Sequence, residues 1–190
     1  MVGKHPNSST QIPNPIPAAI EQTTNPSNTV NTIYTIGHST RSIKDFIALL
    51  QSFEIKVLAD IRSFPGSKRH PQFNSAALER SLKEDGIAYI HMPGLGGKRP
   101  INPGSTQPFG GYTDYMKTTD FVTAIGALEK LAAESHTAYM CAEADWQHCH
   151  RSMVSDHLRV KGWIVMHIMD VGKSMEHPLR ESKPIQGNLF

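Results

Sequence analysis

Residues 137–168 read TAYMCAEADWQHCHRSMVSDHLRVKGWIVMHI, and this stretch decides the fold class. Its two short apolar runs, 137–142 and 163–168, predict strands. The segment between them predicts a helix that begins near 148–150 and ends at Gly162. Strands that alternate with helices are typical of β-α units around a mostly parallel sheet. The stretch therefore predicts an α/β fold.

The same alternation extends back to Thr32 and on to about Asp170. It predicts further strands at 32–36, 55–61 and 87–91, and further helices at 42–53, 74–86 and 119–133. Ser42 with Asp45 resembles a capping box, and Gly86 suits the left-handed end of a helix. We expect a single-domain, Rossmann-like sheet of about five mostly parallel strands with flanking helices.

Both ends of the chain are polar and contain proline. We expect a disordered arm at 1–31, the α/β domain at 32–171 and a polar tail at 172–190. No apolar run is long enough to cross a bilayer, and no signal-peptide core is present in 1–30. The two cysteines match no disulfide framework, which favours a cytoplasmic location without membrane contact. The net charge of +2 permits a polyanionic partner but does not argue for one.

Polar side chains follow the predicted strands, at the sheet edge where open parallel sheets bind ligands. They come from the ends of the first four strands and the start of the next helix: His38, Ser39, Asp60, Arg62, Ser63, His91, Cys141, Glu143, Cys149, His150 and Arg151. This sheet edge is therefore the predicted functional site.

Candidate catalytic groups are Asp60, Glu143 and Cys141. Glu143 follows an apolar strand, where partial burial would raise its pKa toward that of a general acid or base. Arg151 opposes the helix dipole in the first turn of its helix, which suggests an anionic partner, either a ligand or a site carboxylate. Ordinary structural roles are the alternative for each of them, including a solvent-exposed position for Arg151.

The other groups are assigned to substrate binding. Arg62 and Arg151 would hold phosphate or balance the carboxylates, while His38, Ser39 and His91 would orient the substrate.

The cysteines leave several interpretations open. A Cys-based phosphatase loop is excluded, because the position six residues after Cys141 is Gln147 and not arginine. Cys149 and His150 are adjacent in sequence, which does not establish a nucleophile and base pair. Cys141 and Cys149 with the nearby histidines also have the donor types of a metal site, although their spacing is not diagnostic.

Four short motifs occur in order over about 32–170: TIGHS at 35–39, DIRSFP at 60–65, LGG at 95–97, and CAE at 141–143 followed by CHR at 149–151. Together they resemble the motif set of the DUF488 family. The resemblance implies an α/β fold and a site at this motif cluster, which adds Gly96 and Gly97 to the substrate-binding set. It supplies no substrate and no cofactor.

The last five residues, QGNLF, are similar to the peptide by which bacterial repair and replication proteins dock on the DNA sliding clamp. Gln186, Leu189 and Phe190 would be the partner-binding residues. A tail that packs back on its own domain is the alternative.

The leading hypothesis is an enzyme that acts on an anionic nucleotide or nucleic-acid substrate, by hydrolysis of a glycosidic bond, in DNA repair or maintenance. One alternative is a non-catalytic nucleic-acid or partner-binding module, which would use the loop cations Lys68, Arg69, His70, Lys98 and Arg99. The other is a metal-dependent enzyme with Cys and His ligands.

Overall fold

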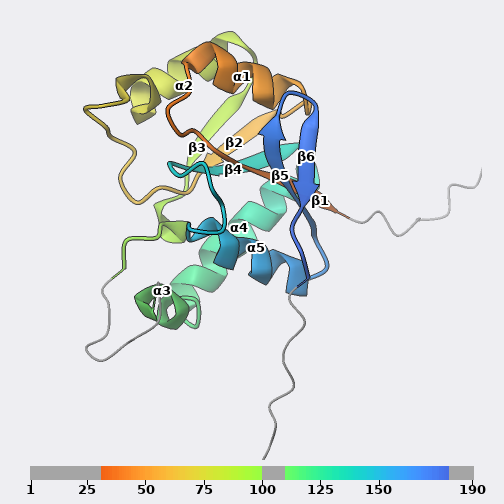
Figure 1. The fold of residues 1–190 in the computed structure, drawn as a ribbon. Coiled ribbons are helices and arrows are strands. Elements are labelled where there is room, and N and C mark those ends of the chain that lie inside the picture. The colour runs from red at the N-terminus through yellow and green to blue at the C-terminus, as the bar shows by residue number, and fades with distance from the viewer. Residues whose placement is uncertain (1–30, 100–109, 180–190) are drawn as a thin grey trace, which may run out of the picture.

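A computed structural model describes residues 31–99 and 110–179. Its strands are β1 (Thr32–Gly37), β2 (Val57–Asp60), β3 (Ala88–His91), β4 (Thr137–Cys141), β5 (Ile164–Asp170) and β6 (Lys173–Glu176). They form one sheet in the order β3-β2-β4-β1-β5-β6 (Figure 1). All neighbouring pairs are parallel except β5 and β6. The predicted α/β fold with a mostly parallel sheet is confirmed.

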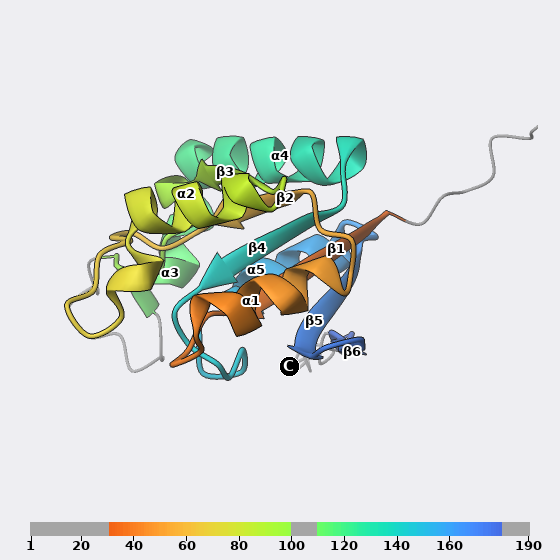
Figure 2. The same cartoon turned by 90° about the horizontal axis from the view of Figure 1, so that it is seen from above.

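Helices cover both faces of the sheet. The helices α1 (Ile43–Gln51) and α2 (Ser75–Glu84) lie above it in Figure 1, and α4 (Thr119–Glu134) and α5 (Arg151–Val160) lie below it. Figure 2, seen from above, shows α1 and α2 in front of the strands. Each face has its own apolar core, with Phe46 and Leu82 in one and Phe121 and Leu158 in the other. Because apolar side chains face both layers, β4 is buried along its whole length.

Local sequence signals explain the helix ends. The Ser42 hydroxyl accepts from the Asp45 main-chain N–H at 3.1 Å and donates to the Asp45 carboxylate at 2.7 Å, which confirms that this pair caps α1. Gly86 has φ of 71°, so the left-handed turn after α2 is also confirmed. Asn74 precedes α2, but its side chain accepts from the Ser67 N–H at 2.6 Å and does not cap the helix.

The structure contains two elements that the sequence pattern did not predict. The strand β6 lies inside the segment expected to be a polar tail, and its residues are largely exposed, so no apolar alternation marks it. The short helix α3 (Gly110–Tyr115) lies at the end of a Gly- and Pro-rich stretch, 93–115, that connects β3 to α4. After β6, the buried His177 bonds His167 and Asp156, both at 2.9 Å, so the ordered domain extends beyond residue 171.

The predicted disordered arm, apart from Asn31, and the predicted clamp-binding residues Gln186, Leu189 and Phe190 lie outside the described residues. Within 31–99 and 110–179, no helix combines the length and the apolar character needed to cross a membrane.

Candidate functional site

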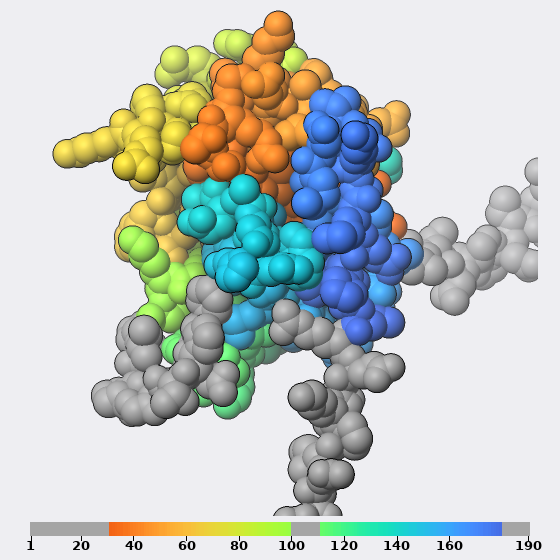
Figure 3. All heavy atoms as spheres, in the orientation of Figure 1, coloured from red at the N-terminus to blue at the C-terminus, as the bar shows by residue number. Residues whose placement is uncertain are grey.

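A cavity of about 350 Å³ opens at the carboxyl ends of β2 and β4. The segments after β2, after β3 and after β4 line it with Arg62, Ser63, Phe64, Gly97, Lys98, Cys141, Ala142, Glu143, His148, Cys149 and His150. The connection from β4 to α5, cyan in Figure 3, forms the surface between the orange β1–α1 segment and the blue β5–β6 hairpin. Because β4 lies between β2 and β1 in the sheet, the loops that follow these strands meet at one edge. This is the edge at which open parallel sheets bind ligands.

Two free thiols meet at the base of this cavity. The Sγ atoms of Cys141, the last residue of β4, and Cys149, which lies just before α5, are 2.7 Å apart. The Cys149 sulfur also lies 3.5 Å from Nδ1 of His150. Both cysteines are almost completely buried, at 2% and 4% exposure. Their separation of eight positions in the sequence gives no sign of this contact.

The pKa values of the two thiols are shifted in opposite directions. The hydrogen bond from Cys141 lowers the pKa of Cys149, the bonds from His150 and from the Arg151 main-chain N–H lower it further, and burial opposes them. Burial raises the pKa of Cys141, and its bond to Cys149 raises it again. These opposite directions favour Cys149 as the thiol of the pair that loses its proton, with Cys141 as the hydrogen-bond donor.

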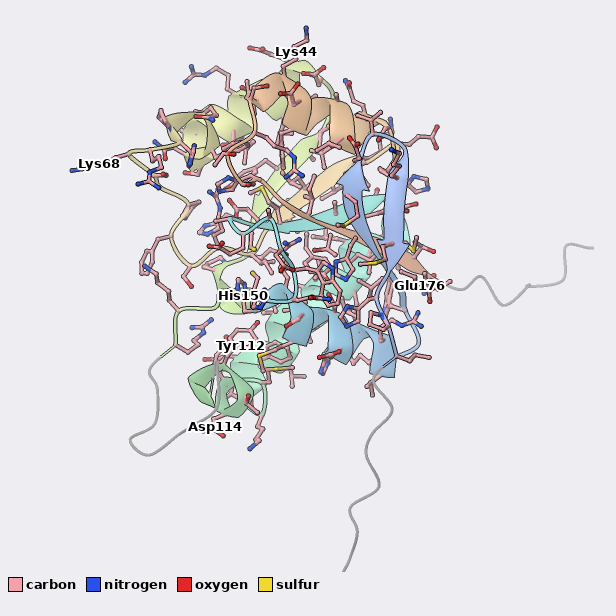
Figure 4. All side chains as sticks on the ribbon, in the orientation of Figure 1. Lys44, Lys68, Tyr112, Asp114, His150 and Glu176 are labelled. Carbon is pink, nitrogen blue, oxygen red and sulfur yellow. The ribbon has the colours of Figure 1, made fainter. Side chains whose placement is uncertain are left out.

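The His150 ring is fixed beside the Cys149 sulfur. Figure 4 shows His150 at the start of α5, close to Tyr112 of α3, and their ring centroids are 5.5 Å apart. The Tyr112 hydroxyl in turn donates to the Leu95 carbonyl at 2.9 Å. Nε2 of His150 is buried without a hydrogen-bond partner among the described residues.

Arg151 is buried, at 1% exposure, beneath the connection that follows β4. Its guanidinium donates to the carbonyls of Glu143 at 2.7 Å and Ala144 at 3.2 Å, and to the Thr35 hydroxyl at 3.3 Å. These oxygens are neutral, and within the described ranges Arg151 forms no ion pair with a carboxylate. Its positive charge therefore stays uncompensated and favours negative charge at the base of the cavity.

The end of β1 holds the same connection from the other side. The main-chain N–H groups of His38 and Ser39 donate to the carbonyls of Cys141 at 3.0 Å and Ala142 at 2.9 Å. A Cβ atom at Gly37 would lie only 1.7 Å from the Glu143 carbonyl oxygen. Only glycine fits at this approach, so Gly37 is required for the observed position of the connection.

Asp60 and Arg62 form a buried ion pair. Asp60 accepts from Nε of Arg62 at 2.8 Å and from Nη2 at 2.5 Å, and from the Tyr89 hydroxyl at 2.8 Å. Asp60 is fully buried and does not line the cavity, whereas Arg62 does. The proposed acid/base role of Asp60 therefore has no geometric support, because the carboxylate is occupied in orienting Arg62.

His38 is a neutral partner of Arg62. Burial lowers the pKa of His38 to about 4, so the ring is uncharged at neutral pH. Its Nδ1 lies 2.9 Å from the Ser39 carbonyl, so this nitrogen carries the proton, and Nε2 accepts from Nη1 of Arg62 at 3.3 Å. Arg62 lines the cavity, and among the described residues its second Nη1 hydrogen has no acceptor.

Glu143 lines the cavity but is exposed, so the partial burial on which its expected role depended is not found. His91 is also exposed, lies outside the cavity lining and contacts the Arg62 carbonyl at 2.9 Å. Ser39 lies outside the lining too, with φ of 52°. Of these predicted site residues, Arg62 and Glu143 therefore line the cavity, whereas His91 and Ser39 lie beside it.

The LGG motif packs against the site, and its last residue, Gly97, lines the cavity. A Cβ atom at Gly96 would lie 2.2 Å from Oγ of Ser63, and one at Gly97 would lie 2.6 Å from the His150 ring. The absence of side chains here lets the segment after β3 pack directly against site residues.

Sequence reasoning missed Phe64 as a site residue. Its ring is 72% exposed at the cavity, with Nζ of Lys98 5.4 Å from the ring centroid. Its place in the DIRSFP motif was the available signal.

The metal-site interpretation gains no support from the geometry. In 31–99 and 110–179, no three His, Cys, Asp or Glu side chains are arranged to hold a metal ion.

Comparison with known proteins gives one family match. Residues 42–158 match the model of a family described as a domain of unknown function, DUF488. No curated protein and no solved structure matches the chain.

Proposed function

The chain belongs to the DUF488 family, and from the geometry of its site we propose that it is a cysteine-dependent enzyme acting on a small anionic substrate. The observation that carries the proposal is the contact of the Cys149 sulfur with the Cys141 sulfur, 2.7 Å apart at the base of the cavity. A thiolate, and not a thiol, is the nucleophilic form of cysteine.

The protein supports this thiolate from several sides. The Cys141 thiol, the His150 ring and the main-chain N–H at the start of α5 all stabilise its negative charge. Such stabilisation is the usual route by which enzymes activate a cysteine at neutral pH. A buried structural cysteine would not be expected to have three donors around its sulfur.

The charges at the cavity favour an anion. Arg62 and Lys98 line it together with one carboxylate, Glu143, and the positive charge of Arg151 lies beneath its base. Asp60 neutralises much of the Arg62 charge but holds its guanidinium in place, with one Nη1 hydrogen left for a ligand. The exposed Phe64 ring offers a flat apolar surface, which suits the planar group of a nucleotide-like substrate.

The proposed reaction has two steps. The Cys149 thiolate attacks the electrophilic atom of the substrate, and the leaving group departs with the electron pair of the broken bond. Water then attacks the covalent adduct and releases the thiolate again. A pair of carboxylates acting on a glycosidic bond is not favoured, since Asp60 is enclosed and Glu143 is exposed.

Alkylation by iodoacetamide tests the nucleophile. We expect Cys149 to react at nearly the same rate between pH 6 and 8, because a thiolate is already formed. The adduct is located by mass spectrometry, and Cys149→Ser is the control that should lose it. A rate that rises about tenfold per pH unit over this range, as for an ordinary thiol, refutes the assignment.

The substrate class is tested by intact-mass analysis. Wild-type protein is incubated with phosphate monoesters and nucleotides and searched for an adduct on Cys149. Arg62→Met should weaken turnover of any anionic substrate found, and turnover that survives Cys149→Ser contradicts the mechanism.

A non-catalytic nucleic-acid-binding module is the second candidate. Lys68 lies on an outer loop, away from the cavity residue His150 in Figure 4, and both Lys68 and Arg69 are exposed. Binding of single-stranded DNA that weakens steeply with salt, survives Cys149→Ser and fails in a Lys68→Ala/Arg69→Ala variant would favour it. Docking of the C-terminal residues on a sliding clamp stays a separate proposal, which loss of binding after deletion of 186–190 would support.

A further inference from the structure

We propose that Cys141 and Cys149 are a redox pair, which a hydroperoxide oxidises to a disulfide inside the cavity. The inference rests on the Cys149 thiolate of the proposed function and adds a role for Cys141. Its role would be that of a resolving thiol, which attacks Cys149 once Cys149 has been oxidised.

The separation of the two sulfurs carries the proposal. They are 2.7 Å apart, and bond formation requires them to approach to about 2.0 Å, a shift of roughly 0.7 Å. Both line the cavity, so neither side chain must cross the protein interior to meet the other. No other pair of sulfurs can compete, since the chain has only two cysteines.

The connection between the cysteines is anchored. Trp146 is buried and stacks on His167, and Arg151 donates to the carbonyl of Glu143 at 2.7 Å. The elements on either side are also fixed: the Cys141 carbonyl accepts from the His38 N–H at 3.0 Å, and Cys149 leads into α5. The small shift is therefore expected in the two cysteine side chains, while β4, the connection and α5 stay in place.

The chemistry balances with a hydroperoxide as oxidant. The Cys149 thiolate attacks one peroxide oxygen, the O–O bond breaks, and an alkoxide leaves with the electron pair and is protonated to the alcohol. Cys149 is then a sulfenic acid. The Cys141 sulfur then attacks the Cys149 sulfur, the S–O bond of the sulfenic acid breaks, and the hydroxide leaves with the electron pair and takes the Cys141 proton to form water as the S–S bond forms. In total the dithiol loses two electrons and the peroxide gains them.

The surroundings of each sulfur indicate which cysteine reacts with the peroxide first. Cys149 attacks first, because its sulfur also lies 3.5 Å from Nδ1 of His150 and this contact lowers its pKa, whereas burial raises the pKa of Cys141. Disulfide formation would remove the nucleophile and protect it from further oxidation to the irreversible acids. A thiol reductant would restore it. The site would therefore be switched off reversibly by peroxide.

The test uses full-length wild-type protein treated with hydrogen peroxide at pH 7 and then with N-ethylmaleimide. We expect the number of maleimide adducts to fall from two to none, with a mass lower by two hydrogen atoms. Dithiothreitol should restore both adducts. Two adducts after peroxide, or a Cys149 sulfinic acid in place of the disulfide, overturns the proposal.

Variants separate the two steps. Cys141→Ser should stop at the Cys149 sulfenic acid, which dimedone labels, and Cys149→Ser should give neither product. Dimedone labelling of wild type that equals that of Cys141→Ser would also overturn the role of Cys141. The pH dependence of alkylation in untreated wild type tests the Cys149 nucleophile without any oxidation. A protein that forms no disulfide but still alkylates independently of pH would therefore overturn the redox pair and leave the proposed function standing.

Discussion

Asp60→Asn tests whether this carboxylate is a structural partner of Arg62 rather than a catalytic group. Asp60 is fully buried and accepts three bonds from Arg62, at 3.1 Å from the main-chain N–H, 2.8 Å from Nε and 2.5 Å from Nη2, and one from Tyr89 at 2.8 Å. Asparagine removes the charge and turns an NH₂ group toward a donor. Arg62, at 7% exposure, is then left buried without its counter-charge.

Breaking a buried pair in this way costs about 3–5 kcal/mol. For a chain of this size, each kcal/mol lowers Tm by about 2–4 °C, so we expect a fall of roughly 6–20 °C. Differential scanning calorimetry measures Tm, and urea unfolding gives the free energy. Asp170→Asn is the matched control, because its ion pair with Lys173 is exposed and 4.0 Å long and should contribute less than about 1 kcal/mol. A loss below about 1 kcal/mol in Asp60→Asn would refute the structural role.

Two other predictions concern the glycine under the β4–α5 connection and the buried histidines. Gly37→Ala should lower Tm and slow alkylation of Cys149, because its Cβ would meet the Glu143 carbonyl, whereas Gly126→Ala in α4, with nothing within 4 Å, should not. Burial lowers the pKa of His38 to about 4 and of His167 to about 3, so the unfolded chain binds more protons below pH 6.5. Urea unfolding should show stability falling from pH 6.5 to 4, with a shallower slope in His38→Gln. Curves of stability against pH that have the same slope in wild type and His38→Gln would contradict the role of His38.

The β-α alternation could be predicted because each parallel strand is a short apolar run. The strand β4, buried along its length, is the clearest example. The strand β6 could not be predicted in this way, because it lies at the sheet edge and its mostly exposed residues, KSME, carry no apolar pattern.

The edge of the sheet at which the cavity opens could be predicted as well, since Arg62, Cys141 and Cys149 lie at or after the carboxyl ends of neighbouring strands. The roles within it could not. Whether a carboxylate such as Asp60 is enclosed or, like Glu143, exposed depends on the packing of segments distant in sequence. The Cys141–Cys149 contact depends on how the connection after β4 folds back, which no spacing rule describes.

The strand order also sets when the protein can fold during its synthesis. The strand β1 pairs only with β4 and β5, and β4 separates it from β2. A ribosome that adds about 5–20 residues per second needs roughly 4–15 s to pass from the end of β2 to the start of β4. Until then, β1 has no neighbouring strand in the emerging chain. The proposed Cys149 nucleophile can therefore form only in a nearly complete domain, and shortened translation products should lack the pH-independent alkylation expected for it.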